Sequence, residues 1–166
     1  MSKHFFVSRK GLSALLQMRE ALQNELYKAT KQMGESVKRD NDLRENPEYM
    51  QLQTKISYEL PSKISDIGRV IGGHILIEET DAIKNDIYDE VVPGCQVEIE
   101  DENGHQRVFS IMGYDESNPS KGVISYLTPI AQSLLHKVIG EEVELIFNGK
   151  HISYEITAIR RSPQLS

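Results

Sequence analysis

A chain of 166 residues is long enough for one ordinary domain or two small ones. Its single cysteine, Cys95, excludes an internal disulfide and a multi-cysteine metal site, and its net charge of −6 argues against a general nucleic-acid-binding protein. No apolar run approaches membrane length, and the N-terminus turns polar too soon for a signal peptide. We therefore expect a soluble, cytoplasmic monomer that makes no membrane contact.

The charge is distributed unevenly between two parts of the chain. Residues 1–75 carry twelve Lys and Arg against nine Asp and Glu, a balance of +3, and residues 76–166 carry seven against sixteen, a balance of −9. This asymmetry favours two modules with different partners, although a solvated helical hairpin beside an acidic domain would have the same charge pattern.

A long helix is predicted from Gly11 to about Val37. Its apolar residues recur at gaps of three, four and seven, which is the coiled-coil period, with Arg19 interrupting the seam. At about 1.5 Å per residue such a helix is roughly 40 Å long, and Ser8 is placed to cap its start. The seam residues are Leu12, Leu15, Leu22, Leu26, Ala29 and Met33.

A turn follows, and a second helix is predicted to begin at Asn46-Pro47, because proline suits the first helical position and asparagine can cap it. Glu48 then lies in the first turn, where negative charge suits the helix dipole. Asp42 and Glu45 lie on the connection, with no core to join. A capping box, with Asp42 as the cap and Glu45 three residues later, is the structural alternative.

The second helical pattern repeats the same spacing and ends at Gly72-Gly73. Two amphipathic helices joined by a short connection pack antiparallel, so the sequence predicts a coiled-coil hairpin. Pro61 interrupts the pattern, either as a tolerated kink near the base or as a bend that re-aims the hairpin. The seam residues are Tyr49, Leu52, Ile56, Leu60, Ile64, Ile67 and Ile71.

The remainder favours a small β domain. Residues 74–89 are predicted to form a strand or an extended linker, and beyond Pro93-Gly94 the apolar period changes to two. Thr128 and Pro129 begin a helix that is expected to reach about Val138. Strands are expected at 97–99, 108–112, 122–126, 142–147 and 152–156, with hairpin turns at 101–104 and 148–149.

The fold class is therefore α+β. It comprises an antiparallel coiled-coil hairpin with an acidic tip over residues 1–75, a connector over 76–92, and a small, mostly antiparallel β domain with one helix over 93–166.

Three segments together carry a family resemblance. Residues 42–49, Asp-Leu-Arg-Glu-Asn-Pro-Glu-Tyr, resemble the tip signature of the Gre transcript cleavage factors, of GreA/GreB type, of bacterial RNA polymerase. Residues 8–12, Ser-Arg-Lys-Gly-Leu, resemble the opening of that family, and residues 128–131, Thr-Pro-Ile-Ala, resemble its Ser/Thr-Pro-Ile-Ala helix. The resemblance covers nearly the whole chain and implies that the β domain is FKBP-like.

The resemblance implies a function for the two tip acids. Two carboxylates can share a magnesium ion whose other ligands come from elsewhere. In this family Asp42 and Glu45 would help to hold the second magnesium ion of the polymerase active centre, reached through the secondary channel, and orient the attacking water. The result is endonucleolytic cleavage of the RNA 3′ end in backtracked complexes. The chain would be a cofactor of the polymerase and not itself an enzyme.

The resemblance also implies supporting contacts. Asn46 and Tyr49 would support the tip. The structural alternatives are a helix cap for Asn46 and a core position for Tyr49. Lys38, Arg39 and Arg44 would face RNA phosphates, but acids interleave with them, so an ordinary solvated face is an equal alternative.

The family's docking contact with the polymerase would fall on Thr128, Pro129, Ile130 and Ala131, which serve equally well as a helix cap and core.

Two rival functions remain. A Gre-like channel regulator would bind polymerase without promoting cleavage, but the presence of both Asp42 and Glu45 argues against it. A coiled-coil adaptor whose FKBP-like domain binds a protein or isomerises proline would not need paired acids on its turn.

Overall fold

The structure, a computed structural model, describes residues 3–39 and 47–165, with the backbone alone for 36–39. It divides into a helical unit, Ser13–Gly73, and a sheet unit made of Met1–Leu12 with His74–Ser166. The predicted α+β class is confirmed. The N-terminal residues belong to the sheet unit, whereas the sequence grouped them with the hairpin.

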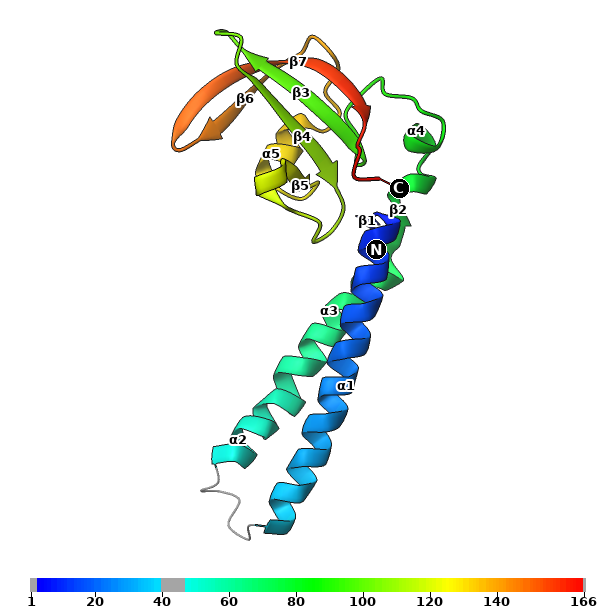
Figure 1. Cartoon of the computed structure of the whole chain (residues 1–166), viewed down its shortest axis with the longest axis vertical. Coiled ribbons are helices and arrows are strands. Elements are labelled where there is room, and N and C mark those ends of the chain that lie inside the picture. The colour runs from blue at the N-terminus through cyan, green and yellow to red at the C-terminus, as the bar shows by residue number, and fades with distance from the viewer. Residues whose placement is uncertain (1–2, 40–46, 166) are drawn as a thin grey trace. The chain divides into compact units, whose positions relative to one another are not determined.

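The helical unit is a hairpin. The long helix α1 runs beside a second, composite helix (Figure 1), and an ion pair between Glu25 Oε1 and Lys55 Nζ, 2.6 Å apart, joins the two. The hydrogen bond from Lys55 holds the pKa of Glu25 below its ordinary value. None of the described helices is long and apolar enough to cross a membrane. The elements are α1 Arg9–Arg39, α2 Pro47–Thr54, the π-helical turn η2 Lys55–Glu59 and α3 Leu60–Gly72.

The predicted seam is the buried face of the hairpin. Every apolar residue named from the two spacings is buried or half-buried, and Arg19, which interrupts the first seam, is half-buried with them. Val70 lies off the predicted spacing and is also buried. Apolar area removed from water along this face stabilises the hairpin at roughly 25 cal/mol per Å².

Pro61 coincides with a change of helix type. It occupies the first turn of α3, directly after η2, and the Leu60 N–H bonds to the Lys55 carbonyl five residues back. A proline removes one backbone N–H, and its ring clashes with the carbonyl four residues back. The π-helical turn directly before Pro61 shifts the hydrogen-bond register from four residues to five at that place. The predicted interruption is confirmed and takes this form.

The sheet unit contains a five-stranded sheet of order β5-β4-β3-β7-β6 (Figure 1). Its pairs are antiparallel except β4 with β5. One face carries the core, and helix α5 contributes Ala131 and Leu134 to it. The elements are β3 Cys95–Asp101, β4 Gln106–Met112, β5 Val123–Ser125, α5 Pro129–Leu134, β6 Glu142–Phe147 and β7 Lys150–Arg161, with the 3-10 turn η4 Pro119–Lys121.

Both predicted hairpin turns are present. Asn148 and Gly149 have φ of 52° and 78°, the left-handed pair that a tight two-residue turn requires. At the other turn the Asp101 carboxylate accepts hydrogen bonds from the backbone N–H groups of Asn103 and His105, each at 2.9 Å. The bond from His105 is the largest of the effects that hold the pKa of Asp101 below its ordinary value.

The predicted end of the α5 helix, at about Val138, is wrong. The helix ends at Leu134, because Leu135 is extended with ψ of 136° and His136 is left-handed with φ of 69°. The His136 N–H donates to the Val91 carbonyl at 2.8 Å, so a tertiary contact ends the helix.

The segment predicted as a strand or linker, 74–89, is more structured than a linker. It contains strand β2 His74–Leu76, the 3-10 turn η3 Ile77–Glu79 and a short helix, α4 Asp81–Lys84. Strand β1, Phe5–Val7, pairs in parallel with β2 and was not predicted. The Phe6 carbonyl accepts the Tyr114 N–H at 2.8 Å, which ties β1 to the chain beyond β4.

Cys95 is fully buried in the core, and burial raises the pKa of its thiol. We expect no alkylation of the native chain by iodoacetamide at pH 7.5 and complete, single-site alkylation in guanidinium chloride, because only an exposed thiolate reacts. Intact mass measured over time checks this. Native alkylation as fast as in the unfolded chain would contradict the burial.

Candidate functional site

The tip end of the hairpin is the end at which α1 stops, at Arg39, and α2 starts, at Pro47. Seven residues, 40–46, connect them in sequence, and they include the predicted site residues Asp42, Arg44, Glu45 and Asn46. These four lie outside the described residues. Pro47 begins α2 with Glu48 in its first turn, and both were predicted.

The first turn of α2 is fixed onto α1. Gln32 Nε2 donates to Glu48 Oε1 at 3.2 Å, which joins the first turn of α2 to α1. Tyr49 is half-buried beside this contact, in line with the buried Leu52, so it occupies the seam position that its spacing predicted. The two ends of the connection are thus held together by a packed and hydrogen-bonded pair of helices.

The chemistry of Asp42 and Glu45 suits a shared metal ion. Magnesium prefers hard oxygen ligands in octahedral geometry, and one or two carboxylates with water and phosphate commonly suffice. Among the residues that the structure describes, no group of three or more His, Cys, Asp and Glu side chains is arranged to hold a metal ion. Magnesium ligation by Asp42 and Glu45, with the remaining ligands supplied from elsewhere, therefore stays a prediction.

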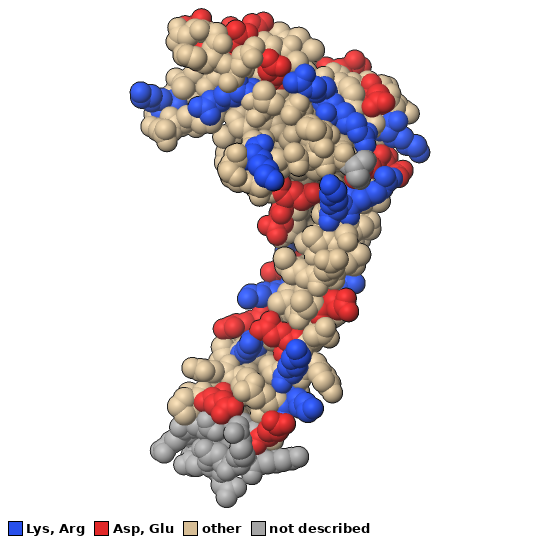
Figure 2. Space-filling view, in the orientation of Figure 1, with Lys and Arg blue, Asp and Glu red and all other residues tan. Residues whose placement is uncertain are grey.

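The described surface of the hairpin carries both signs of charge. Lys28, Lys31 and Glu35 of α1 are exposed, and the face in Figure 2 shows Lys and Arg interspersed with Asp and Glu along the hairpin. This mixture is the ordinary solvated face that was the alternative to a basic stripe. Lys38 and Arg39 end α1 with side chains outside the described part, so their predicted contact with RNA, like that of Arg44, stays a prediction.

The segment Thr128–Ala131 forms the capped start of α5. Thr128 Oγ1 accepts the Ala131 N–H at 3.3 Å and donates to the Ser125 carbonyl at 2.8 Å, so the predicted cap is confirmed. Ala131 is fully buried and Ile130 packs against the core, whereas Pro129 is exposed. A partner protein can therefore reach Pro129, while Ala131 serves the core.

An exposed apolar residue beside this cap was not predicted from the sequence. Leu127 is 48% exposed, directly before Thr128. Val138 and Ile139, beyond the end of α5, are 41% and 57% exposed. The apolar spacing does not mark Val138 and Ile139 as exposed, because α5 ends earlier than its pattern suggests and the left-handed His136 follows it.

The start of α1 is held by two carboxylates that the sequence did not indicate. Glu116 accepts the Ser8 N–H at 3.0 Å and the Ser8 hydroxyl, and the same hydroxyl accepts the Gly11 N–H at 3.0 Å. Glu78 accepts the Arg9 N–H with both oxygens at 3.1 Å. A helix start has free N–H groups and partial positive charge, so these carboxylates satisfy and stabilise it.

Glycine leaves room for a close approach at two places in this arrangement. A Cβ on Gly11 would lie 2.5 Å from the Glu116 carboxyl carbon, and a Cβ on Gly113 would lie 2.5 Å from the Phe6 carbonyl oxygen. The opening motif Ser8 to Gly11 therefore has a physical reason: a capping hydroxyl and a gap for Glu116.

Comparison with known proteins identifies similar chains. The family model described as "Transcription elongation factor, GreA/GreB, C-term" matches residues 84–161. The transcription elongation factor GreA of Nautilia profundicola is 30% identical over 126 residues, which are 75% of each chain. That of Caldanaerobacter subterraneus subsp. tengcongensis is 29% identical over 162 residues, 97% of this chain and 100% of the relative. The crystal structure of GreA factor homolog 1 (Gfh1) of Thermus thermophilus is 20% identical, covers 95% of this chain and 99% of its own, and gives a TM-score of 0.43.

Proposed function

Because the chain belongs to the GreA/GreB family of transcription elongation factors, we propose that it inserts its hairpin tip into the secondary channel of bacterial RNA polymerase and stimulates endonucleolytic cleavage of the 3′ end of backtracked RNA. One observation carries this proposal. Two packed helices, α1 and α2, hold both ends of a seven-residue connection that carries Asp42 and Glu45. A rigid, narrow support for two carboxylates is what delivery of these groups into a channel requires.

The two carboxylates act together at the polymerase active centre. Magnesium, when bound there, supplies an activated water and neutralises charge that develops on the phosphate. Asp42 and Glu45 offer oxygen ligands for that ion and accept a hydrogen bond from the attacking water, which orients it. The polymerase supplies the remaining ligands and the catalytic core, so the chain is a cofactor of the polymerase and does not cleave RNA alone.

The residues around the tip position these groups. Tyr49 fills the seam behind the connection, and Asn46, which lies outside the described residues, is the predicted cap of α2. Lys38, Arg39 and Arg44 place positive charge near RNA phosphates, an attraction that weakens with salt.

A stalled, backtracked elongation complex with labelled RNA tests the function. The full chain, added at neutral pH with magnesium, is expected to release short 3′ fragments that the complex alone releases far more slowly. Binding without fragment release would favour the channel regulator, and absence of binding would favour the adaptor; either result contradicts the proposal.

We further propose that the exposed apolar start of α5 docks on the polymerase. Replacing Leu127 by aspartate should raise the dissociation constant for polymerase about tenfold, because a charge would be buried in an apolar contact. The matched control is Ile146→Asp, since Ile146 is 59% exposed on β6 of the same unit. Fluorescence anisotropy of the labelled chain measures both. Docking at this place would be contradicted if the two variants weakened polymerase binding equally, or if neither variant weakened it.

A further inference from the structure

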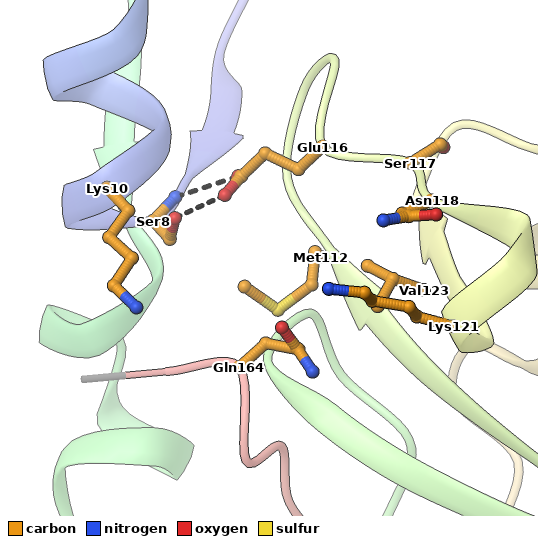
Figure 3. A pocket seen from close by; sticks show the side chains of 9 residues that line it. All are labelled: Ser8, Lys10, Met112, Glu116, Ser117, Asn118, Lys121, Val123 and Gln164. Carbon is orange, nitrogen blue, oxygen red and sulfur yellow. Dashed lines mark hydrogen bonds between the residues drawn. The ribbon is translucent and has the colours of Figure 1, made fainter.

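A pocket of about 270 Å³ lies wholly within the sheet unit (Figure 3). Lys10 reaches it from the first turn of α1, Asn118 and Lys121 from the segment between β4 and β5, and Gln164 from the C-terminal segment. Met112 and Val123, both buried, form its apolar floor. The transcript-cleavage proposal uses none of these residues.

The two lysines carry charge that the protein leaves uncompensated. Both side chains are exposed, and within the part of the chain that the structure describes neither ammonium group forms a hydrogen bond or an ion pair. Figure 3 shows both ammonium groups turned toward the pocket. The two cations come from elements far apart in sequence and line one small space. An anion in that space would supply the partner that both ammonium groups lack.

The acid at the rim, Glu116, is paired with neither lysine in the described structure. Glu116 accepts hydrogen bonds from the Ser8 N–H and hydroxyl and from the Gly113 N–H, at 3.0 Å for each N–H. These donors belong to the start of α1 and to the chain after β4, so the carboxylate is already satisfied by the protein.

The polar amide in the pocket presents a donor. Asn118 Oδ1 accepts the Ser120 hydroxyl at 2.8 Å, which fixes the amide and leaves its NH₂ group directed toward the pocket (Figure 3). Gln164 also lines the pocket, and Figure 3 shows its amide oxygen on the side of Lys121. Ammonium and amide N–H groups are donors to oxyanions.

We propose that this pocket binds an oxyanion of the phosphate class, either free phosphate or the phosphate group of a nucleotide. The match is in charge and in hydrogen bonding: the two ammonium groups and the Glu116 carboxylate leave the lining a net charge of +1, and the ammonium groups and the Asn118 NH₂ group are donors for the oxygens of an oxyanion. The apolar floor leaves room beside the anion for an organic group.

Titration of the ¹⁵N-labelled full chain with inorganic phosphate, followed by two-dimensional NMR, tests the proposal. Saturable shifts are expected for the amides of residues 117–123 and 164–165. Lys121→Gln should weaken binding about tenfold, the loss expected for one charge-assisted hydrogen bond. Lys10→Gln should weaken it similarly, and both variants change exposed side chains, so the fold is retained.

The matched control is Lys150→Gln, which removes one charge from the exposed start of β7 in the same unit and should leave the affinity unchanged. A parallel titration with adenosine monophosphate distinguishes the two ligand classes. Tighter binding of adenosine monophosphate than of phosphate identifies the ligand as a nucleotide, and equal binding identifies it as free phosphate. Shifts that do not saturate, or equal weakening by Lys150→Gln, would overturn the site. Because polymerase is absent, this result is independent of transcript cleavage.

Discussion

Replacing Asp42 by asparagine is expected to lower the rate of transcript cleavage by about 100-fold or more, the usual effect of removing one preorganised charged group from a reacting centre. Asparagine keeps the size of the side chain and removes its negative charge, so the loss reports on metal and water contacts and not on shape. Glu45→Gln should have a similar effect. The rate of 3′ fragment release at saturating chain measures both.

The two substitutions should not be additive, since the carboxylates act on one ion and one water. The double variant is expected to be about as slow as either single variant. Polymerase binding should survive, because the proposed docking residues at the start of α5 are not altered. Glu35→Gln, an exposed acid near the end of α1, is the matched control and should retain full activity. Full activity in Asp42→Asn or Glu45→Gln would defeat the assignment of the tip acids.

Gly113→Ala is expected to destabilise the chain by about 3 kcal/mol or more, at the upper end of the overpacking range. The new Cβ would lie 2.5 Å from the Phe6 carbonyl oxygen and 2.7 Å from the Val7 Cα. Both are backbone atoms of β1, so no side chain can move to make room. The strand would have to leave its place beside the chain after β4, where Phe6 accepts the Tyr114 N–H.

Urea unfolding followed by circular dichroism measures this change in the free energy of unfolding. Gly11→Ala is the graded comparison: its Cβ would meet only the end of the Glu116 side chain, which can move away at the cost of its hydrogen bonds to Ser8. Gly68→Ala is the opposite control, because nothing lies within 4 Å of its Cβ inside α3. Alanine there should stabilise by about 1 kcal/mol. A Gly113→Ala variant as stable as the wild type would contradict the close approach of β1.

The parts of the fold that depend on local pattern could be predicted from the sequence. The hairpin followed from apolar spacing, because the residues from Leu12 to Ile71 that share one helical face are the ones that are buried or half-buried. The Asn148-Gly149 turn and the Thr128 cap followed from side chains that satisfy the backbone within a few residues.

The parts that depend on distant residues could not. The pairing of β1 with β2 involves three residues in each strand, too few to show a period. Glu116 lies 108 residues from the Ser8 that it binds, and Glu78 lies 69 residues from Arg9. The early end of α5 depends on a hydrogen bond from His136 to Val91, which no local propensity encodes.

The tip acids were identified by resemblance more than by chemistry. From spacing alone, Asp42 and Glu45 are equally a capping box, because three residues separate a cap from its reciprocal acid just as they separate these two. The family signature through residues 42–49, together with the similar segments at 8–12 and 128–131, distinguishes the metal-ligand interpretation from the capping box.

The most direct test of the tip's position replaces magnesium in the polymerase active centre with ferrous iron and adds ascorbate and peroxide, so that hydroxyl radicals cut peptide bonds close to the ion. The chain, bound to the complex and labelled at one end, should be cut between Arg39 and Pro47. Cuts confined to residues 84–161, or no cut in the bound chain, would contradict delivery of Asp42 and Glu45 to the active centre.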